Sequence, residues 1–335
     1  MKKLLPLLFL LIATVALVAC GGDSEDEPDT AGQAQSTTES EAAPETTAKT
    51  TDAEASTESP GEDDTAKVVI ETEEQTPPGG GVFRRLWADP PTLDPHLTGD
   101  TTSAGIVVEI FSGLVTINTD LALVPDIAQE WQVDDTGTVY TFTLRDNATF
   151  HNGEKVTAHD FKWSIERAAS PELASHLADT YLNDIIGAED YIEGNAESIE
   201  GVQVIDERTL QITIDAPKAY FLAKLSYPTA FVLHQETVES GGRNWWVDNA
   251  VGTGPFKLDE YRIGERIVLK RFDDYYREPR PDVDAINMNL AGGQAMAMYE
   301  NDEIDVTGVG LFDLERVLNP EAPQKAGQVV APPGF

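Results

Sequence analysis

Residues 125–163, PDIAQEWQVDDTGTVYTFTLRDNATFHNGEKVTAHDFKW, contain the signals that decide the fold of this chain. From 139 to 144 the side chains alternate, which sends Tyr140, Phe142 and Leu144 to one face of a predicted strand. The turn signal at 134–137 predicts that residues 131–133 pair back onto this strand. Asn152 and Gly153 predict a second tight turn.

A helix is predicted directly after this second turn. Thr157 stands at an N-cap position with Asp160 three residues further on, and Phe161 and Ile165 share one face. Taken alone, a strand pair followed by a capped helix is typical of a packed unit in any α/β domain.

Length and charge limit the classes of protein to consider. The chain has 335 residues and a formal net charge of −36, which favours one or two domains and argues against binding to nucleic acid or to anionic lipid surfaces. There is one cysteine, so an intramolecular disulfide is excluded.

The first 19 residues predict a signal peptide. A short basic start precedes an apolar run from Leu4 to Val18, which is short for a membrane span. Residues 17–20 match the bacterial lipobox, and Cys20 is the single cysteine of the chain. We therefore predict cleavage before Cys20 and a lipid anchor on its thiol; a plain secretory signal is the alternative.

Residues 20–81 predict a disordered acidic tether. Ser, Thr, Ala, Pro and Glu dominate, with 17 acidic residues against two lysines between 21 and 81. Such a segment buries too little apolar surface to offset its ordering entropy. We expect a spacer that holds the folded part away from the membrane, and a partner-binding acidic tail is the alternative.

Periodicity and turn signals predict further elements in the folded part. Strands are expected at 82–87, 227–233, 267–270 and 285–290, hairpins at 115–123 and 201–214, and helices at 102–113, 171–190, 217–225 and 295–301.

The chain resembles the family 5 extracellular solute-binding proteins, which include the oligopeptide- and dipeptide-binding receptors of ABC importers. Their signature runs P-x-hydrophobic-A-x-x-W, then T-Y-T-F-x-L-R, then A-x-F-x-x-G-x-x-V-T-A-x-D-F. The matching positions are Pro125, Ala128, Trp131, Tyr140, Thr141, Phe142, Leu144, Arg145, Ala148, Phe150, Gly153, Val156, Thr157, Ala158, Asp160 and Phe161. Shorter matches occur at 111–114, 252–256 and 301–305.

This resemblance implies a mixed α/β, periplasmic-binding-protein-like type II fold. It implies a first lobe formed by 82–112 and 235–335, with an inserted subdomain at 113–234. Family members are usually longer, so the second lobe is expected to be missing from this chain.

The resemblance also implies a ligand cleft built from loops. Its expected residues are Gly99, Asp100, Thr101, Thr102, His176, Leu177, Thr307, Gly308, Val309 and Gly310. It implies capture of an oligopeptide or similar small solute and delivery to ABC permease subunits, with the folded part in the periplasm or outside the cell. No cofactor or metal is expected.

Other interpretations of single features were weighed. His96 is expected to fix a turn, since no second histidine stands at metal-ligand spacing. Trp245 and Trp246 are expected to have a packing or turn role and not to stack on a ligand. An enzyme is disfavoured because no Ser or Cys nucleophile has a recognisable context. A sensory or adhesive surface lipoprotein on the same scaffold is the alternative function.

Overall fold

The computed structural model describes residues 80–318. The predicted signal peptide, the lipid site at Cys20 and nearly all of the predicted tether therefore lie outside the described residues. Within 80–318, no helix is both long enough and apolar enough to cross a membrane.

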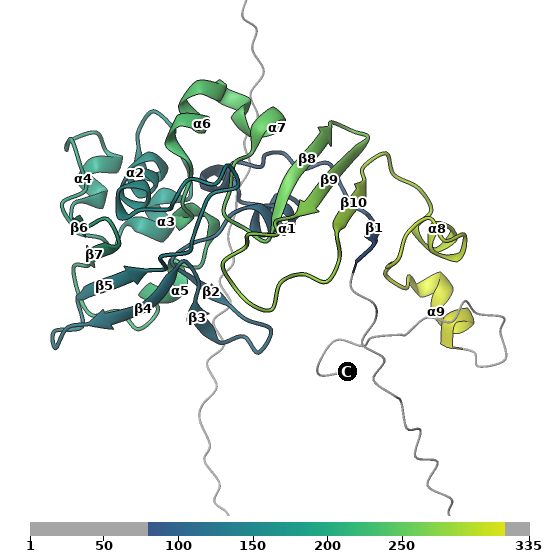
Figure 1. The fold of residues 1–335 in the computed structure, drawn as a ribbon, viewed down its shortest axis with the longest axis horizontal. Coiled ribbons are helices and arrows are strands. Elements are labelled where there is room, and N and C mark those ends of the chain that lie inside the picture. Colours follow the sequence, from purple (N-terminus) through teal and green to yellow (C-terminus); the bar gives the residue numbers. More distant parts are fainter. Residues whose placement is uncertain (1–79, 319–335) are drawn as a thin grey trace, which may run out of the picture. The chain divides into compact units, whose positions relative to one another are not determined.

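One four-stranded sheet is built entirely from antiparallel neighbours, and we call it the hairpin sheet (Figure 1). The predicted return strand is confirmed, with Trp131 opposite Phe142, and so is the predicted hairpin at 201–214. The strands follow the order β4-β5-β7-β6 and comprise β4 (Ala128–Val133), β5 (Val139–Leu144), β6 (Val202–Asp206) and β7 (Thr209–Thr213).

The inner face of the hairpin sheet packs against α2 (Ala158–Ala169). Tyr140, Phe142 and Leu144 are buried, as their alternation predicts. The predicted capping box is confirmed, since the Thr157 side chain accepts from the Asp160 N–H and the Asp160 carboxylate accepts from the Thr157 N–H at 2.8 Å. The cap satisfies helix-end donors and fixes where α2 begins.

The second four-stranded sheet, called here the mixed sheet, joins distant parts of the chain. Its edge strand β1 runs parallel to β10, with Val82 opposite Ala285, while its other pairs are antiparallel. Helix α1 (Thr101–Ile110) buries Ile106, Val107 and Ile110 in the core beside this sheet. In order, its strands are β1 (Val82–Leu86), β10 (Ala285–Asn289), β9 (Arg266–Arg271) and β8 (Phe256–Arg262).

The remaining elements are short. The predicted hairpin at 115–123 is confirmed as the ladder of β2 and β3. These elements are η1 (Pro95–Leu97), β2 (Val115–Ile117), β3 (Leu123–Pro125), α3 (Ala178–Leu182), α4 (Ala188–Ile192), α5 (Phe221–Lys224), η2 (Pro228–Ala230), α6 (Gln235–Gly241), η3 (Gly242–Asn244), α7 (Trp245–Asn249), α8 (Ala295–Glu300) and α9 (Leu311–Leu318).

Three of the predicted helices differ clearly in extent from the structure, and the one expected at 217–225 is only the four-residue α5, Phe221–Lys224. The prediction of a helix over 171–190 is wrong: turns interrupted by α3 and α4 occupy this stretch, and Ala174 (φ 53°) and Gly187 (φ 80°) have left-handed backbones that a continuous helix excludes. The helix expected at 102–113 ends at Ile110, because Phe111 takes an extended conformation.

The predicted strand at 227–233 is also wrong. Pro228 begins the short helix η2, and the chain beyond it has no strand partner in the described sheets. Its backbone donors are satisfied elsewhere, since Val232 N–H donates to the Ser112 carbonyl and Leu233 N–H to Ser164 Oγ. The apolar run is therefore buried as an irregular segment, which periodicity cannot distinguish from a strand.

Each four-stranded sheet has its own core, and polar contacts join the two. The core of the hairpin sheet also takes in Phe272, Tyr275 and Tyr276 from the chain after β9. His151 is one joint: its Nδ1 accepts from Gly252 N–H at 3.2 Å, so Nε2 carries the proton and donates to the Gly254 carbonyl at 3.0 Å. The domain boundaries given above stay a prediction.

Candidate functional site

The carboxyl ends of β1 and β10 lie at the same end of the mixed sheet, because these strands are parallel. In open α/β sheets, ligands bind outside the carboxyl ends of the strands. From β1 the chain passes through Trp87 and η1 to the start of α1. The predicted ligand loop 99–102 ends this connection.

The start of α1 is fixed by two hydrogen bonds. Asp100 is the N-cap residue, and its carboxylate accepts from Ser103 N–H at 2.9 Å. The indole N–H of Trp87 donates to the Thr102 carbonyl at 3.0 Å. Thr101 is exposed and Thr102 half-buried in the first turn of the helix. These contacts hold the loop in one place while leaving part of its surface open.

Gly99 brings the first predicted loop against His176 and Leu177. A Cβ atom built on Gly99 would lie 3.0 Å from His176 Nε2 and 3.7 Å from a methyl carbon of Leu177. Glycine thus permits an approach that a side chain would disturb. The predicted residues at 99 and at 176–177, 77 positions apart, are neighbours in the structure.

Two tyrosines that the sequence analysis did not propose lie beside this contact. Tyr181 and Tyr227 are stacked, with ring centroids 3.9 Å apart and planes 8° from parallel. Tyr227 Oη donates to the Thr98 carbonyl at 3.3 Å, and Tyr181 N–H donates to the Leu177 carbonyl. Burial raises the pKa of Tyr227, so its hydroxyl stays protonated. The partly exposed ring pair forms an aromatic wall next to Gly99.

A buried ion pair holds η1, the short helix that precedes the loop at 99–102. Arg167 of α2 lies 2.6 Å from Asp94, the N-cap residue of η1, and the indole N–H of Trp245 donates to the same carboxylate at 3.1 Å. Burial raises the pKa of Asp94, but hydrogen bonding to Arg167 and its charge outweigh burial and lower this pKa overall. The ionised carboxylate thus ties η1 to both α2 and α7.

His96 completes this support and is not available to a metal. Arg167 donates to its Nδ1 at 2.9 Å, so Nε2 carries the proton and donates to the Phe231 carbonyl at 3.0 Å. Burial, together with the charge of Arg167, lowers the pKa of His96 to about 4. The expected turn-fixing role is therefore supported. Among residues 80–318, no group of three or more His, Cys, Asp or Glu side chains is arranged to hold a metal ion.

Trp245 and Trp246 both belong to the interior. They are 3% and 8% exposed, and Trp246 stacks on Tyr261 with centroids 5.9 Å apart. Their burial supports the expected packing role.

The second predicted loop, 307–310, follows a short contact with β1. Val306 forms an isolated bridge with Arg85, and Asp305 forms an ion pair with Arg84 at 2.6 Å. Thr307 is half-buried, whereas Gly308, Val309 and Gly310 are exposed. This places the loop beside the outer edge of β1, and within residues 80–318 no hydrogen bond or ion pair joins it to residues 99–102. Its part in a ligand site stays a prediction.

Arg85, whose backbone forms the bridge with Val306, has an unusual environment. Its guanidinium carbon is 3.9 Å from the centroid of the Trp87 ring, and its Nε is buried without a hydrogen-bond partner. Burial lowers the pKa of Arg85, and the charge of Glu109 on α1 acts in the opposite direction. Sequence reasoning had no signal for this residue beyond its place in a strand.

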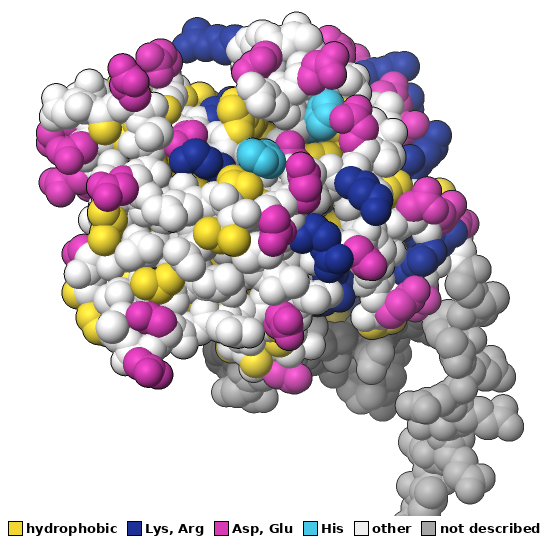
Figure 2. All heavy atoms as spheres, turned by 60° about the vertical axis from the view of Figure 1, so that its left-hand side comes forward, with side chains coloured by type: hydrophobic (Ala, Val, Ile, Leu, Met, Phe, Trp, Pro, Cys, Tyr) yellow, Lys and Arg dark blue, Asp and Glu magenta, His cyan; other side chains and the backbone are white. Residues whose placement is uncertain are grey.

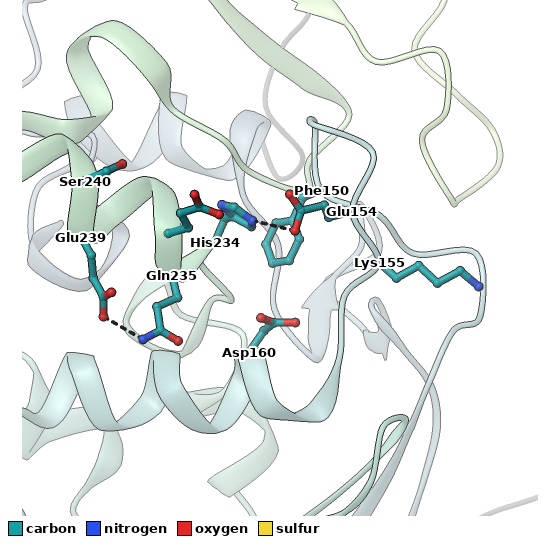
Figure 3. Close-up of a pocket in the computed structure, with 9 residues that line it drawn as sticks. Phe150, Glu154, Lys155, Asp160, His234, Gln235, Glu239 and Ser240 are labelled. Atoms are coloured by element: carbon teal, nitrogen blue, oxygen red, sulfur yellow. Dashed lines mark hydrogen bonds and ion pairs between the residues drawn. The ribbon is translucent and has the colours of Figure 1, made fainter.

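Another hollow lies elsewhere, between the turn at 152–153, α2 and α6. It measures about 570 Å³, and its residues include Glu154, Asp160, His234 and Glu239 (Figure 3). Glu154 contacts His234 at 3.2 Å, and Gln235 donates to Glu239, while Lys155 extends away from the group. Asp160 caps α2. Because these polar groups already pair with one another, we do not place the ligand site there.

Charge does not single out another site on the face drawn in Figure 2. Acidic side chains are interspersed with lysines and arginines on this face and do not gather into one patch. A smaller hollow of about 290 Å³ lies at the mixed sheet. Its lining residues are Arg84, Arg85, Glu265, Arg266, Asn287, Asn289, Met298, Glu303 and Ile304.

Several known proteins with similar sequences are peptide-binding proteins by name, and one is named as a probable deoxycholate-binding protein. The chain is 30% identical to the dipeptide-binding protein DppE of Bacillus subtilis, covering 66% of this chain and 41% of that protein. It is also 30% identical to the periplasmic oligopeptide-binding protein OppA of Salmonella typhimurium, covering 70% and 44%. The chain thus spans less than half the length of these relatives.

Solved structures give the same result for the fold. An oligopeptide-binding protein of Borrelia burgdorferi (OppAIV) matches with a TM-score of 0.63 and 35% identity over 67% of this chain and 46% of that chain. The substrate-binding domain of an oligopeptide ABC transporter from Bacillus anthracis matches with a TM-score of 0.67 and 27% identity over 71% and 47%. The expected mixed α/β fold of this class is confirmed.

The family model for the middle region of bacterial extracellular solute-binding proteins, family 5, matches residues 122–333. Members of this family bind solutes and are not enzymes, and they are periplasmic or exported. This match covers more than half of the chain and includes the signature stretch with which the sequence analysis began. The chain therefore belongs to family 5 of the bacterial extracellular solute-binding proteins.

Proposed function

We propose that this chain contributes the first half of a peptide-binding cleft in an ABC import system. One observation carries the proposal: the loop at Gly99, at the carboxyl end of β1, packs on His176 and Leu177 beside the stacked pair of Tyr181 and Tyr227. The relatives named as peptide-binding proteins support it, and one of them, OppA of Haemophilus influenzae, has been solved in complex with RPPGFSPFR.

The chemistry of this surface suits a peptide. Backbone polar groups of the loop can pair with peptide groups, and the tyrosine rings offer apolar area for side chains. Binding needs no bond to be made or broken. In this proposal, the half-cleft captures the solute and a permease receives it.

The test is calorimetric titration of the chain with a mixed pool of di- to pentapeptides. We expect measurable heat for the unaltered chain and at least tenfold weaker binding for Tyr227→Ala, which removes the aromatic wall. Tyr220→Ala is the control, because Tyr220 is 54% exposed and is not one of the two stacked rings. Equal affinity in both variants, or no heat from the unaltered chain, would overturn the proposal.

We also propose that a lipid on Cys20 anchors the protein and that residues 21–81 act as a spacer. The anchor is expected to be lost in Cys20→Ala, which should move the protein from the membrane fraction to the soluble exported fraction. Cys20→Ala protein that stays in the membrane fraction would refute the anchor.

A further inference from the structure

Arg85 is a partly buried cation that forms no direct ion pair with the described residues. Of the three arginines that line the 290 Å³ hollow, Arg84 pairs with Asp305 and Arg266 pairs with Glu260. For Arg85, the described residues provide neither an ion pair nor a hydrogen bond. A charged group that loses solvation is normally compensated by a partner.

The environment of Arg85 leaves room for an external partner. Its Nε atom is inaccessible and unsatisfied, whereas its two Nη atoms are not among the buried unsatisfied atoms of the described residues. The terminal donors are therefore open to solvent. Glu109 on α1 attracts Arg85 through space but forms no ion pair with it.

Arg85 is also held in place before any ligand arrives. Its guanidinium lies over the Trp87 ring, and Trp87 is fixed by its hydrogen bond to Thr102 and by the close approach of Gly105. The Arg85 backbone pairs with Met288 on one side and with Val306 on the other. A guanidinium positioned in this way loses little side-chain entropy on binding.

We propose that Arg85, with its guanidinium held over Trp87 and its backbone beside Val306, binds a carboxylate group of the captured solute. The planar fork of an arginine matches a carboxylate in two parallel hydrogen bonds. The inference rests on the proposed function for its location at the cleft, and it adds a substrate class: solutes that carry a free carboxylate.

Peptide titrations test the inference with three matched probes: trialanine, its C-terminal amide, and the C-terminal amide of Ala-Glu-Ala. We expect Arg85→Gln to weaken trialanine binding about 10- to 100-fold and to leave binding of trialanine amide unchanged. If Arg85→Gln instead weakens binding of the Ala-Glu-Ala amide, the partner of Arg85 is an acidic side chain of the peptide. Arg85→Lys should retain part of the affinity.

A control variant separates a binding role from a general effect of removing an arginine. Arg243→Gln removes an exposed arginine of η3 and should change no affinity. If Arg85→Gln weakens all three peptides equally, or none, the inference is wrong.

A second measurement keeps the inference independent of peptide transport. The Nε–H resonance of Arg85, assigned by its loss in Arg85→Gln, is followed by NMR during titration with succinate. A saturable shift without any peptide binding would support the anion site and contradict the proposed function. Peptide binding without a shift of this resonance, whether succinate or trialanine is added, would support the proposed function and contradict the anion site.

Discussion

The two four-stranded sheets are built from contacts of very different sequence range. In the hairpin sheet, β4 pairs with β5 and β6 with β7 across short turns. In the mixed sheet, β1 pairs with β10, and Val82 lies opposite Ala285, about 200 residues further along the chain. The hairpin sheet carries the family signature, whereas the candidate site combines the loop that follows β1 of the mixed sheet with Tyr181, which packs against the core of the hairpin sheet. Local sequence patterns thus specify the hairpin sheet. Pairing between segments that are distant in the sequence forms the mixed sheet and positions the loop that follows β1.

The largest expected effect comes from lowering the pH, which should protonate the buried histidines at the contacts between the two sheets. Burial lowers the pKa of both His96 and His151 from 6.5 to about 4. Both side chains are neutral in the folded protein. Their contribution to the free energy of unfolding is therefore complete above pH 6.5 and is lost as the pH falls toward 4. Each should remove about 3 kcal/mol of unfolding free energy across this window.

Urea unfolding between pH 7 and pH 4 measures this loss. His159→Gln is the control, since His159 is exposed on α2 and should leave the slope unchanged. A free energy of unfolding that stays constant across the window would show that the two histidines do not link stability to pH.

The next largest effect is expected when the ion pair of Arg167 and Asp94, which supports the candidate site, is removed. Arg167→Ala leaves the 2% exposed side chain of Asp94 without its cation, so we expect a loss of about 3–5 kcal/mol in urea unfolding. The matched change is Lys270→Ala, whose partner Asp259 is exposed, with an expected loss below about 1 kcal/mol. Similar losses for the two variants would contradict the role given to the joint.

A smaller effect sharpens the local side of the comparison. Thr157→Ala removes the N-cap of α2 and should cost about 1 kcal/mol of unfolding free energy. Thr157→Ser keeps the hydroxyl and should recover most of it. If the serine variant is as unstable as the alanine variant, the hydroxyl contributes no stability.

The sequence predicted the elements whose signals lie close together. Alternation from 139 to 144 and the spacing of Thr157 and Asp160 require only neighbouring residues, and both predictions are confirmed. The strand predicted at 227–233 is wrong, because its apolar run is buried by packing and has no strand beside it. Whether an apolar segment finds a strand partner is decided by distant residues.

The candidate site shows the same limit. The resemblance placed Gly99 and His176 in the site, and the structure brings them together. Tyr181 and Tyr227 could not be proposed, because 46 positions separate them and neither has a local signal of contact. The pair of Asp94 and Arg167 joins residues 73 positions apart, and only the folded chain reveals it.

The central claim is that peptide binds at the carboxyl end of β1, beside Gly99 and the tyrosine pair. The most direct test is photo-crosslinking with a tripeptide that carries a benzophenone side chain, followed by mass-spectrometric mapping of the adducts. The account predicts adducts within 99–102, at 176–177, or at Tyr181 and Tyr227. Adducts confined to the hollow between Glu154 and Glu239 would contradict it.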